Sequence, residues 1–141
     1  MKPTQLMVRN EMTDDLDILP ERFFGWWNDI IKREEDASVE EFSQYFSDNA
    51  EIITNEKLVC KGLEDITKHF MGVKTKTSSC AARLPMKNIF SKENKIFVHY
   101  LIDAAFESEK QVIAVMGYML INSGKIETSC QLQYVQESKI S

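Results

Sequence analysis

The chain has 141 residues, the usual size of one domain, with 43% hydrophobic and 28% charged residues as in ordinary globular proteins. Its net charge of −5, without a basic run, argues against binding to nucleic acid or to an anionic membrane. No stretch reaches the roughly 18 uninterrupted apolar residues of a membrane span, and the N-terminus lacks the apolar core of a signal peptide. We therefore expect a cytoplasmic protein.

The first part of the chain predicts a flexible tail followed by a helix. Residues 1–16 show no sustained periodicity and are expected to form the tail. A helix is predicted over 18–34, because Phe23, Trp27 and Ile31 recur at helical spacing on one apolar face.

Two further helices are predicted from their own local signals. Ser38 and Glu41 form a capping box at the start of a helix over 39–47. A third helix over 63–73 follows Gly62 and repeats apolar residues at helical spacing.

The rest of the chain is typical of β-strands. Pro85 lies inside one of them, and because proline has no N–H to donate, that strand is predicted at a sheet edge or with a bulge. We expect a single domain over 17–136 and a C-terminal tail over 137–141. The predicted strands cover residues 51–54, 57–60, 79–90, 95–107, 111–121 and 125–136.

The register of the last hairpin is predicted from its turn. A three-residue loop at 122–124 pairs Ile121 with Lys125 and gathers apolar side chains on one face. We expect this face to point inward. It carries Val112, Ala114, Met116, Tyr118, Leu120, Ile126, Thr128, Cys130, Leu132 and Tyr134.

The preceding hairpin leaves two alternatives. Pairing Glu107 with Gln111 places Tyr100 and the other even-numbered residues of 96–106 on that same face and buries no charge, so we favour it. A two-residue loop would instead place His99 and Asp103 there.

Two short motifs and the order of elements resemble a known superfamily. The segment FSQYFSDNAEI at 42–52 resembles the junction between second helix and first strand in nuclear transport factor 2-like proteins, in the SnoaL-like and ketosteroid-isomerase-like branch. The segment KGLEDI at 61–66 resembles the start of their third helix. The resemblance implies an α+β fold, in which a cone-shaped, curved antiparallel sheet wraps around three helices. It also implies an apolar pocket and a homodimer through the sheet.

The catalytic residues of ketosteroid isomerases do not carry over by this resemblance. Thr54 stands near the position of their general-base aspartate, and Met116 aligns with their oxyanion-stabilising aspartate. The helix over 18–34 has no tyrosine. Without the base nothing removes the proton, which argues against that reaction.

The leading functional prediction is a domain that binds a small hydrophobic or aromatic molecule, without an assignable reaction. The proposed pocket residues are mainly apolar, which suits such a ligand. They are Trp27, Phe70, Tyr100, Met116, Tyr118 and Cys130.

Two alternatives remain open. The first is an isomerase, dehydratase or cyclase that uses Asp103 or His99 as general base. The second is a dimeric protein-interaction module. Neither metal nor cofactor is expected, because Cys60, Cys80, Cys130 and the two histidines show no metal-ligand spacing.

Overall fold

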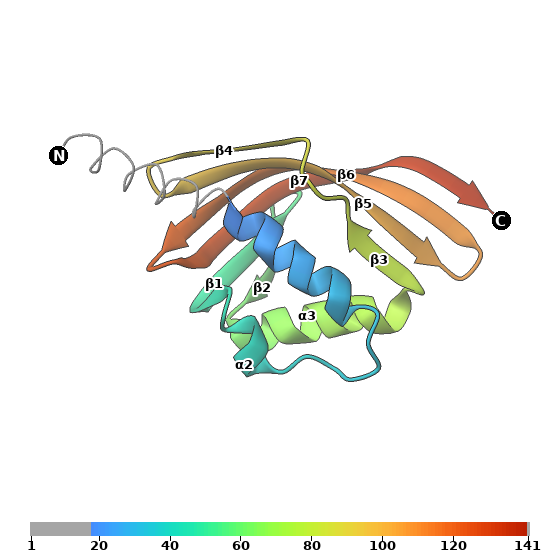
Figure 1. Ribbon diagram of the computed structural model, residues 1–141, viewed down its shortest axis with the longest axis horizontal. Coiled ribbons are helices and arrows are strands. Elements are labelled where there is room, and N and C mark those ends of the chain that lie inside the picture. Colours follow the sequence, from blue (N-terminus) through green and yellow to red (C-terminus); the bar gives the residue numbers. More distant parts are fainter. Residues whose placement is uncertain (1–17, 141) are drawn as a thin grey trace.

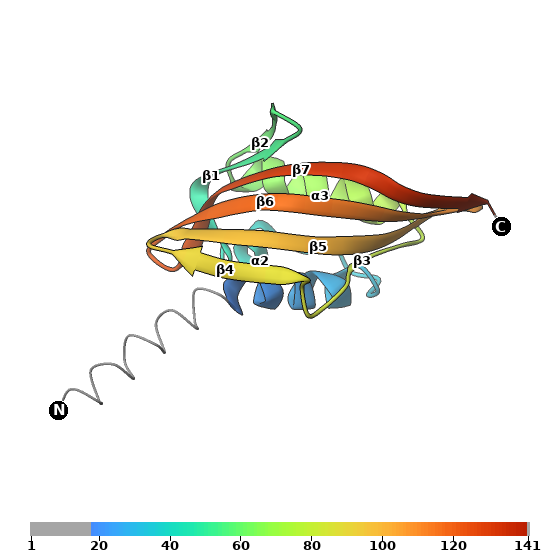
Figure 2. The same cartoon turned by 90° about the horizontal axis from the view of Figure 1, so that it is seen from above.

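The computed structural model describes residues 18–140, and the predicted tail over 1–16 lies outside them. A long curved sheet forms one layer, and the helices lie on its concave side (Figure 1). Seen from above, the strands run side by side across the helices (Figure 2). None of the described helices is long and apolar enough to cross a membrane. The expected cone-shaped α+β architecture is confirmed.

The first two helices are shorter than predicted. The helix over 18–30 ends where Lys32 and Arg33 bond to carbonyls only three residues back. Helix α2 (Val39–Phe42) keeps the predicted capping box. It ends early because Tyr45 already accepts a hydrogen bond from strand β7 and β1 begins at the next residue. Helix α3 (Leu63–Lys76) extends one turn beyond its prediction.

The seven described strands form one mixed sheet. Its order is β2-β1-β7-β6-β5-β3, with β4 also paired to β5, and β1 runs parallel to β7 while the other pairs are antiparallel. The strands are β1 (Phe46–Thr54), β2 (Lys57–Lys61), β3 (Ser79–Ala82), β4 (Asn88–Lys92), β5 (Lys95–Phe106), β6 (Glu109–Asn122) and β7 (Lys125–Ile140).

Three predicted segments differ from the observed strands. Strand β1 begins at Phe46, five residues before the strand predicted over 51–54. The strand expected over 79–90 is divided into β3 and β4, which pair with opposite halves of β5. Pro85 lies in the connection, where no ladder N–H is needed. Strand β7 continues to Ile140, so the segment expected as a C-terminal tail is β-structure up to that residue.

The predicted register of the last hairpin is wrong. Asn122 pairs with Lys125, and a bulge then shifts the ladder so that Tyr118 pairs with Cys130. The β5–β6 turn has the two-residue form that we had not favoured, because Phe106 pairs with Glu109. The even-numbered residues of β5 do face inward as predicted, but opposite odd-numbered residues of β6.

The inward face of β6 is therefore the opposite of the predicted one. Val115, Met119 and Ile121 are buried against the helices, whereas Met116 is 57% exposed on the convex side. Apolar residues occupy both faces of β6, so the alternation itself did not say which face meets the core. Gly117 lies between them, where an added Cβ would overlap the carbonyl oxygen of Cys130 on β7.

Candidate functional site

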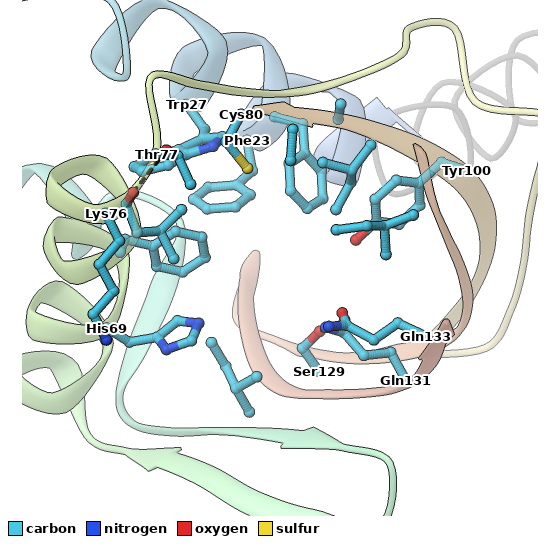
Figure 3. Close-up of a pocket in the computed structure, with 18 of the residues that line it drawn as sticks. Phe23, Trp27, His69, Lys76, Thr77, Cys80, Tyr100, Ser129, Gln131 and Gln133 are labelled. Carbon is cyan, nitrogen blue, oxygen red and sulfur yellow. Dashed lines mark hydrogen bonds between the residues drawn. The ribbon is translucent and has the colours of Figure 1, made fainter. Parts of the chain in front are cut away.

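A cavity of about 270 Å³ lies on the concave side of the sheet (Figure 3). Its wall combines the helix over 18–30, helix α3 and the inward faces of the central strands. The lining is mostly aromatic and aliphatic, which is the usual composition of a small-molecule site. It comprises Phe23, Phe24, Trp27, Phe46, Ile52, His69, Phe70, Val73, Lys76, Thr77, Cys80, Ala82, Tyr100, Ile102, Ala104, Phe106, Ile113, Met119, Ser129, Gln131 and Gln133.

Aromatic rings hold one another in place along the apolar wall. The rings of Trp27 and Phe70 lie 4.9 Å apart edge to face, and Phe24 lies 4.9 Å from Tyr100. Phe23 contacts Phe70 at 5.5 Å and joins the two groups. Such edge-to-face contacts add to burial, so this wall is packed before any ligand enters.

Tyr100 is the most unusual polar residue of the cavity. Its side chain comes from the middle of β5, the residue is only 1% exposed, and its hydroxyl points into the cavity (Figure 3). No partner within residues 18–140 hydrogen-bonds to this hydroxyl. Burial, followed by the neighbouring Cys80, raises the pKa of Tyr100, so the hydroxyl stays protonated and can donate. A buried donor without a partner costs roughly 1–3 kcal/mol.

A polar row on β7 faces the same space. Ser129, which is 5% exposed, donates to the side-chain oxygen of Gln131 at 3.4 Å. Gln131 in turn donates to Thr54 on β1 at 3.4 Å. The Asn55 side chain holds the backbone of Gln133 through bonds of 2.9 and 3.3 Å. The three β7 side chains lie together on the lower right wall in Figure 3.

Two basic side chains of the cavity lining lie on α3. His69 and Lys76 are both exposed at its edge. Partial burial lowers the pKa of His69, and the nearby Lys76 charge lowers it further, so neutral imidazole is favoured. Among the lining residues within 18–140 there is no carboxylate.

The described residues show no metal-ligand cluster, and two of the thiols are held in the protonated form. No group of three or more His, Cys, Asp or Glu in the described part of the chain is arranged to hold a metal ion. Burial, and secondarily Asp65, raises the pKa of Cys60 to about 11, and burial raises the pKa of Cys80. Both thiols therefore resist becoming the nucleophilic thiolate.

The predicted pocket residues are divided between the two faces of the sheet. Trp27, Phe70 and Tyr100 line the cavity together. The other three, Met116, Tyr118 and Cys130, lie on the other face of the sheet. The residues of this part of β6 and β7 that face the cavity are Met119, Ser129 and Gln131.

The structure does not bring the two predicted general bases to the cavity. Asp103 lies on the outer face, where Arg83 donates two hydrogen bonds of 2.8 Å to its carboxylate. Those bonds are the main reason why the pKa of Asp103 is lowered. His99 lies beside the amide of Asn88, 3.5 Å from its ring nitrogen, on the same outer face.

Sequence reasoning missed the polar part of the cavity. Ser129, Gln131 and Gln133 alternate along β7, and the predicted register of the last hairpin places them on the face opposite the apolar one. No local signal marked them as inward, because the polar face of an alternating strand is normally the solvent face. His69, which lines the cavity edge, was not among the predicted pocket residues.

No family model and no curated protein sequence matches the chain. Solved structures do resemble it. An LEH-like epoxide hydrolase from M. tuberculosis superposes with a TM-score of 0.66 at 10% identity, over 89% of this chain and 85% of that one. A SnoaL-like polyketide cyclase from Agrobacterium tumefaciens str. C58 gives 0.65 at 11% identity, over 86% and 91%.

A third similar structure is a protein from Catenulispora acidiphila with a ketosteroid isomerase-like fold, solved with trimethylamine. It gives a TM-score of 0.59 at 6% identity, over 77% of this chain and 80% of that one. The chain has the nuclear transport factor 2-like fold. At such low identities the likeness establishes the nuclear transport factor 2-like architecture alone, and function has to be argued from the cavity.

Proposed function

We propose that this protein binds a small, mainly apolar molecule in the cavity enclosed by the sheet and the helices. The observation that carries the proposal is the Tyr100 hydroxyl, which is buried, points into the cavity and has no partner within the described residues. A bound molecule with a polar atom would supply that partner. The packed aromatic wall formed by Phe24, Trp27 and Phe70 would receive its apolar part.

Binding is favoured over proton-transfer catalysis by the chemistry of the lining. An isomerase or cyclase that abstracts a proton needs a base within hydrogen-bonding reach of its substrate. Asp103 and His99 lie on the outer face, the described lining contains no carboxylate, and its imidazole, that of His69, lies exposed at the cavity edge. The activities named for the structural neighbours belong to those proteins.

The test is a cavity-filling substitution with a matched control one residue away. Ala104 lines the cavity at 3% exposure, whereas Ala105, its neighbour on β5, points to the opposite face. One- and two-ring neutral compounds, with 2-naphthol as reference, would be screened by thermal shift and calorimetry. We expect Ala104→Leu to weaken binding at least about tenfold, through lost space, and Ala105→Leu to leave it unchanged.

Binding that survives equally in both variants would contradict the proposal, as would a screen in which no compound shifts the melting temperature. The melting curve of each unliganded variant serves as the folding control. Because a compound that binds only the folded state raises its stability by mass action, the thermal shift reports binding directly.

We also propose that a second copy of the chain covers the outer face of the sheet. Large apolar side chains are exposed there, including Phe90 at 57%, Met116 at 57%, Leu132 at 61% and Tyr134 at 63%. A contiguous apolar patch of this kind is typical of interfaces, and a two-fold pair would bury the same patch from both chains.

Light scattering coupled to size-exclusion chromatography tests this second proposal. Leu132→Lys is expected to convert a dimer to a monomer. Leu84→Lys changes an exposed leucine in the connection beside Gly25, on the helix side, and is expected to leave the dimer intact. A wild-type chain that is monomeric at high concentration would overturn the proposal.

A further inference from the structure

The described lining of the cavity carries a lysine, Lys76, and no carboxylate, although the chain has a net charge of −5. His69 and Lys76 are the cavity's ionisable lining groups besides the half-buried Cys80 and the buried Tyr100, whose raised pKa values keep them uncharged. Because no carboxylate lies in the described lining to offset the lysine, a ligand of negative charge is favoured at this edge of the cavity.

Lys76 is available to such a ligand. It forms no ion pair with a described carboxylate, whereas Lys74, two residues earlier on α3, lies 3.8 Å from Asp36 and bonds to the Glu34 carbonyl. Side chains on a helix lean toward its N-terminus, and the Lys76 chain extends back along α3 toward the His69 ring (Figure 3). The influence of the Lys76 charge on the pKa of His69 reflects this proximity.

The opposite wall supplies a second polar anchor. Tyr100 lies on the β5 side, across the cavity from the two α3 residues, and its hydroxyl is protonated and without a described partner (Figure 3). The rings of Phe70 and Trp27, 4.9 Å apart, line the same cavity. The volume of about 270 Å³ is near the lower end of ligand pockets, so one or two rings would occupy it.

We propose that the ligand is a one- or two-ring organic carboxylate that carries an oxygen substituent at its far end. Its carboxylate lies between Lys76 and His69, its rings lie against Phe70 and Trp27, and its far oxygen pairs with the Tyr100 hydroxyl. This inference rests on the proposed binding function and names the chemical class of the ligand.

The test uses four matched compounds and calorimetry: 6-hydroxy-2-naphthoate, 6-hydroxy-2-naphthamide, 2-naphthoate and 2-naphthamide. Lys76→Gln removes the charge at the edge. Lys68→Gln is the control, because Lys68 is exposed on the same helix but does not line the cavity. Tyr100→Phe removes only the buried hydroxyl.

We expect each acid to bind more tightly than its amide. Lys76→Gln should weaken the acids about two- to fivefold and leave the amides unchanged, because an exposed ion pair contributes modestly. Added salt should reduce the preference for the acids in wild type. Tyr100→Phe should abolish the advantage of the hydroxylated compounds, and Lys68→Gln should change none of the four affinities.

Two results would overturn the inference, and they differ in meaning. If the amides bind as tightly as the acids, or if Lys76→Gln weakens both equally, the anionic class is wrong while the cavity still binds small molecules. If none of the four compounds binds and the neutral screen also fails, the proposed binding function is wrong as well.

Discussion

The two faces of the central strands depart from the usual pattern of a half-buried sheet. The inward face carries Tyr100, Ser129 and Gln131 among its apolar residues, whereas the outward face carries Met116 and Leu132 largely exposed. Polar groups are normally placed outward, and alternating strands are read on that basis. Here the inward face borders a cavity that can hold polar partners, so polar side chains can face inward as well.

The largest expected difference between the faces is in stability. Phe23 is 1% exposed and contacts five other rings, so Phe23→Ala should lower the free energy of unfolding by about 3–5 kcal/mol. Phe90 is 57% exposed on the outer face, and Phe90→Ala should cost under about 1 kcal/mol. Denaturant unfolding of both variants measures the difference. Equal losses would show that the outer face is also part of a buried core, as in an obligate dimer.

A smaller difference is expected when a single hydroxyl is removed from each face. Tyr100→Phe removes a buried donor without a described partner, so the free energy of unfolding should stay constant or rise by up to about 1 kcal/mol. Tyr118→Phe leaves the outer ring under Lys95, which lies 4.7 Å from its centroid, and should be close to neutral. Thermal and denaturant melts of the unliganded proteins test this. A marked loss of stability in Tyr100→Phe would show that its hydroxyl already has a partner.

On the outer face, the Asp103–Arg83 pair should be visible in titration. The two hydrogen bonds from Arg83 lower the pKa of Asp103, and NMR should find it below the ordinary value. A carboxyl with a lowered folded pKa stabilises the fold above its unfolded pKa, and this contribution is lost as the pH falls through the folded value. Arg83→Gln should return the pKa of Asp103 toward normal. An unchanged value in that variant would contradict the assignment.

At the cavity edge the smallest effect is expected in the titration of His69. Burial and the Lys76 charge both disfavour the imidazolium, so the pKa of His69 should lie below its usual 6.5. Lys76→Gln should raise it, because one of the two causes is removed, whereas Lys68→Gln should have a weaker effect. Two-dimensional NMR of the imidazole protons against pH provides the measurement. A pKa above the ordinary value would indicate an anionic partner near His69.

Much of the secondary structure could be predicted, because its signals are local. The capping box of Ser38 and Glu41 appears as predicted, since it depends on residues three positions apart. The hairpin over β1 and β2 and the helix after Gly62 also follow from short segments. Helix ends were less accurate, because the pairing of β1 with β7 stopped α2 four residues after it began.

The candidate site could be predicted only in part. Trp27 and Phe70 lie on helical stripes, whose period points them to the interior, and both line the cavity. The predicted register of the β6–β7 hairpin was wrong, and the predicted inward face of β6 is the outward one. For these two reasons we expected Met116, Tyr118 and Cys130 in the cavity. The bulge near Glu127 and the two-residue turn after Phe106 depend on the whole ladder and leave no clear local signal.

The sequence by itself determined the order of elements, the aromatic stripe of the first helix and the resemblance to the nuclear transport factor 2-like fold. These depend on spacing along the chain, which the sequence states directly. Only the tertiary structure decided which face of β6 and β7 meets the helices, and therefore which residues line the cavity. A strand with apolar residues on both faces can be buried on either, and the choice depends on how the helices and the curved sheet pack together.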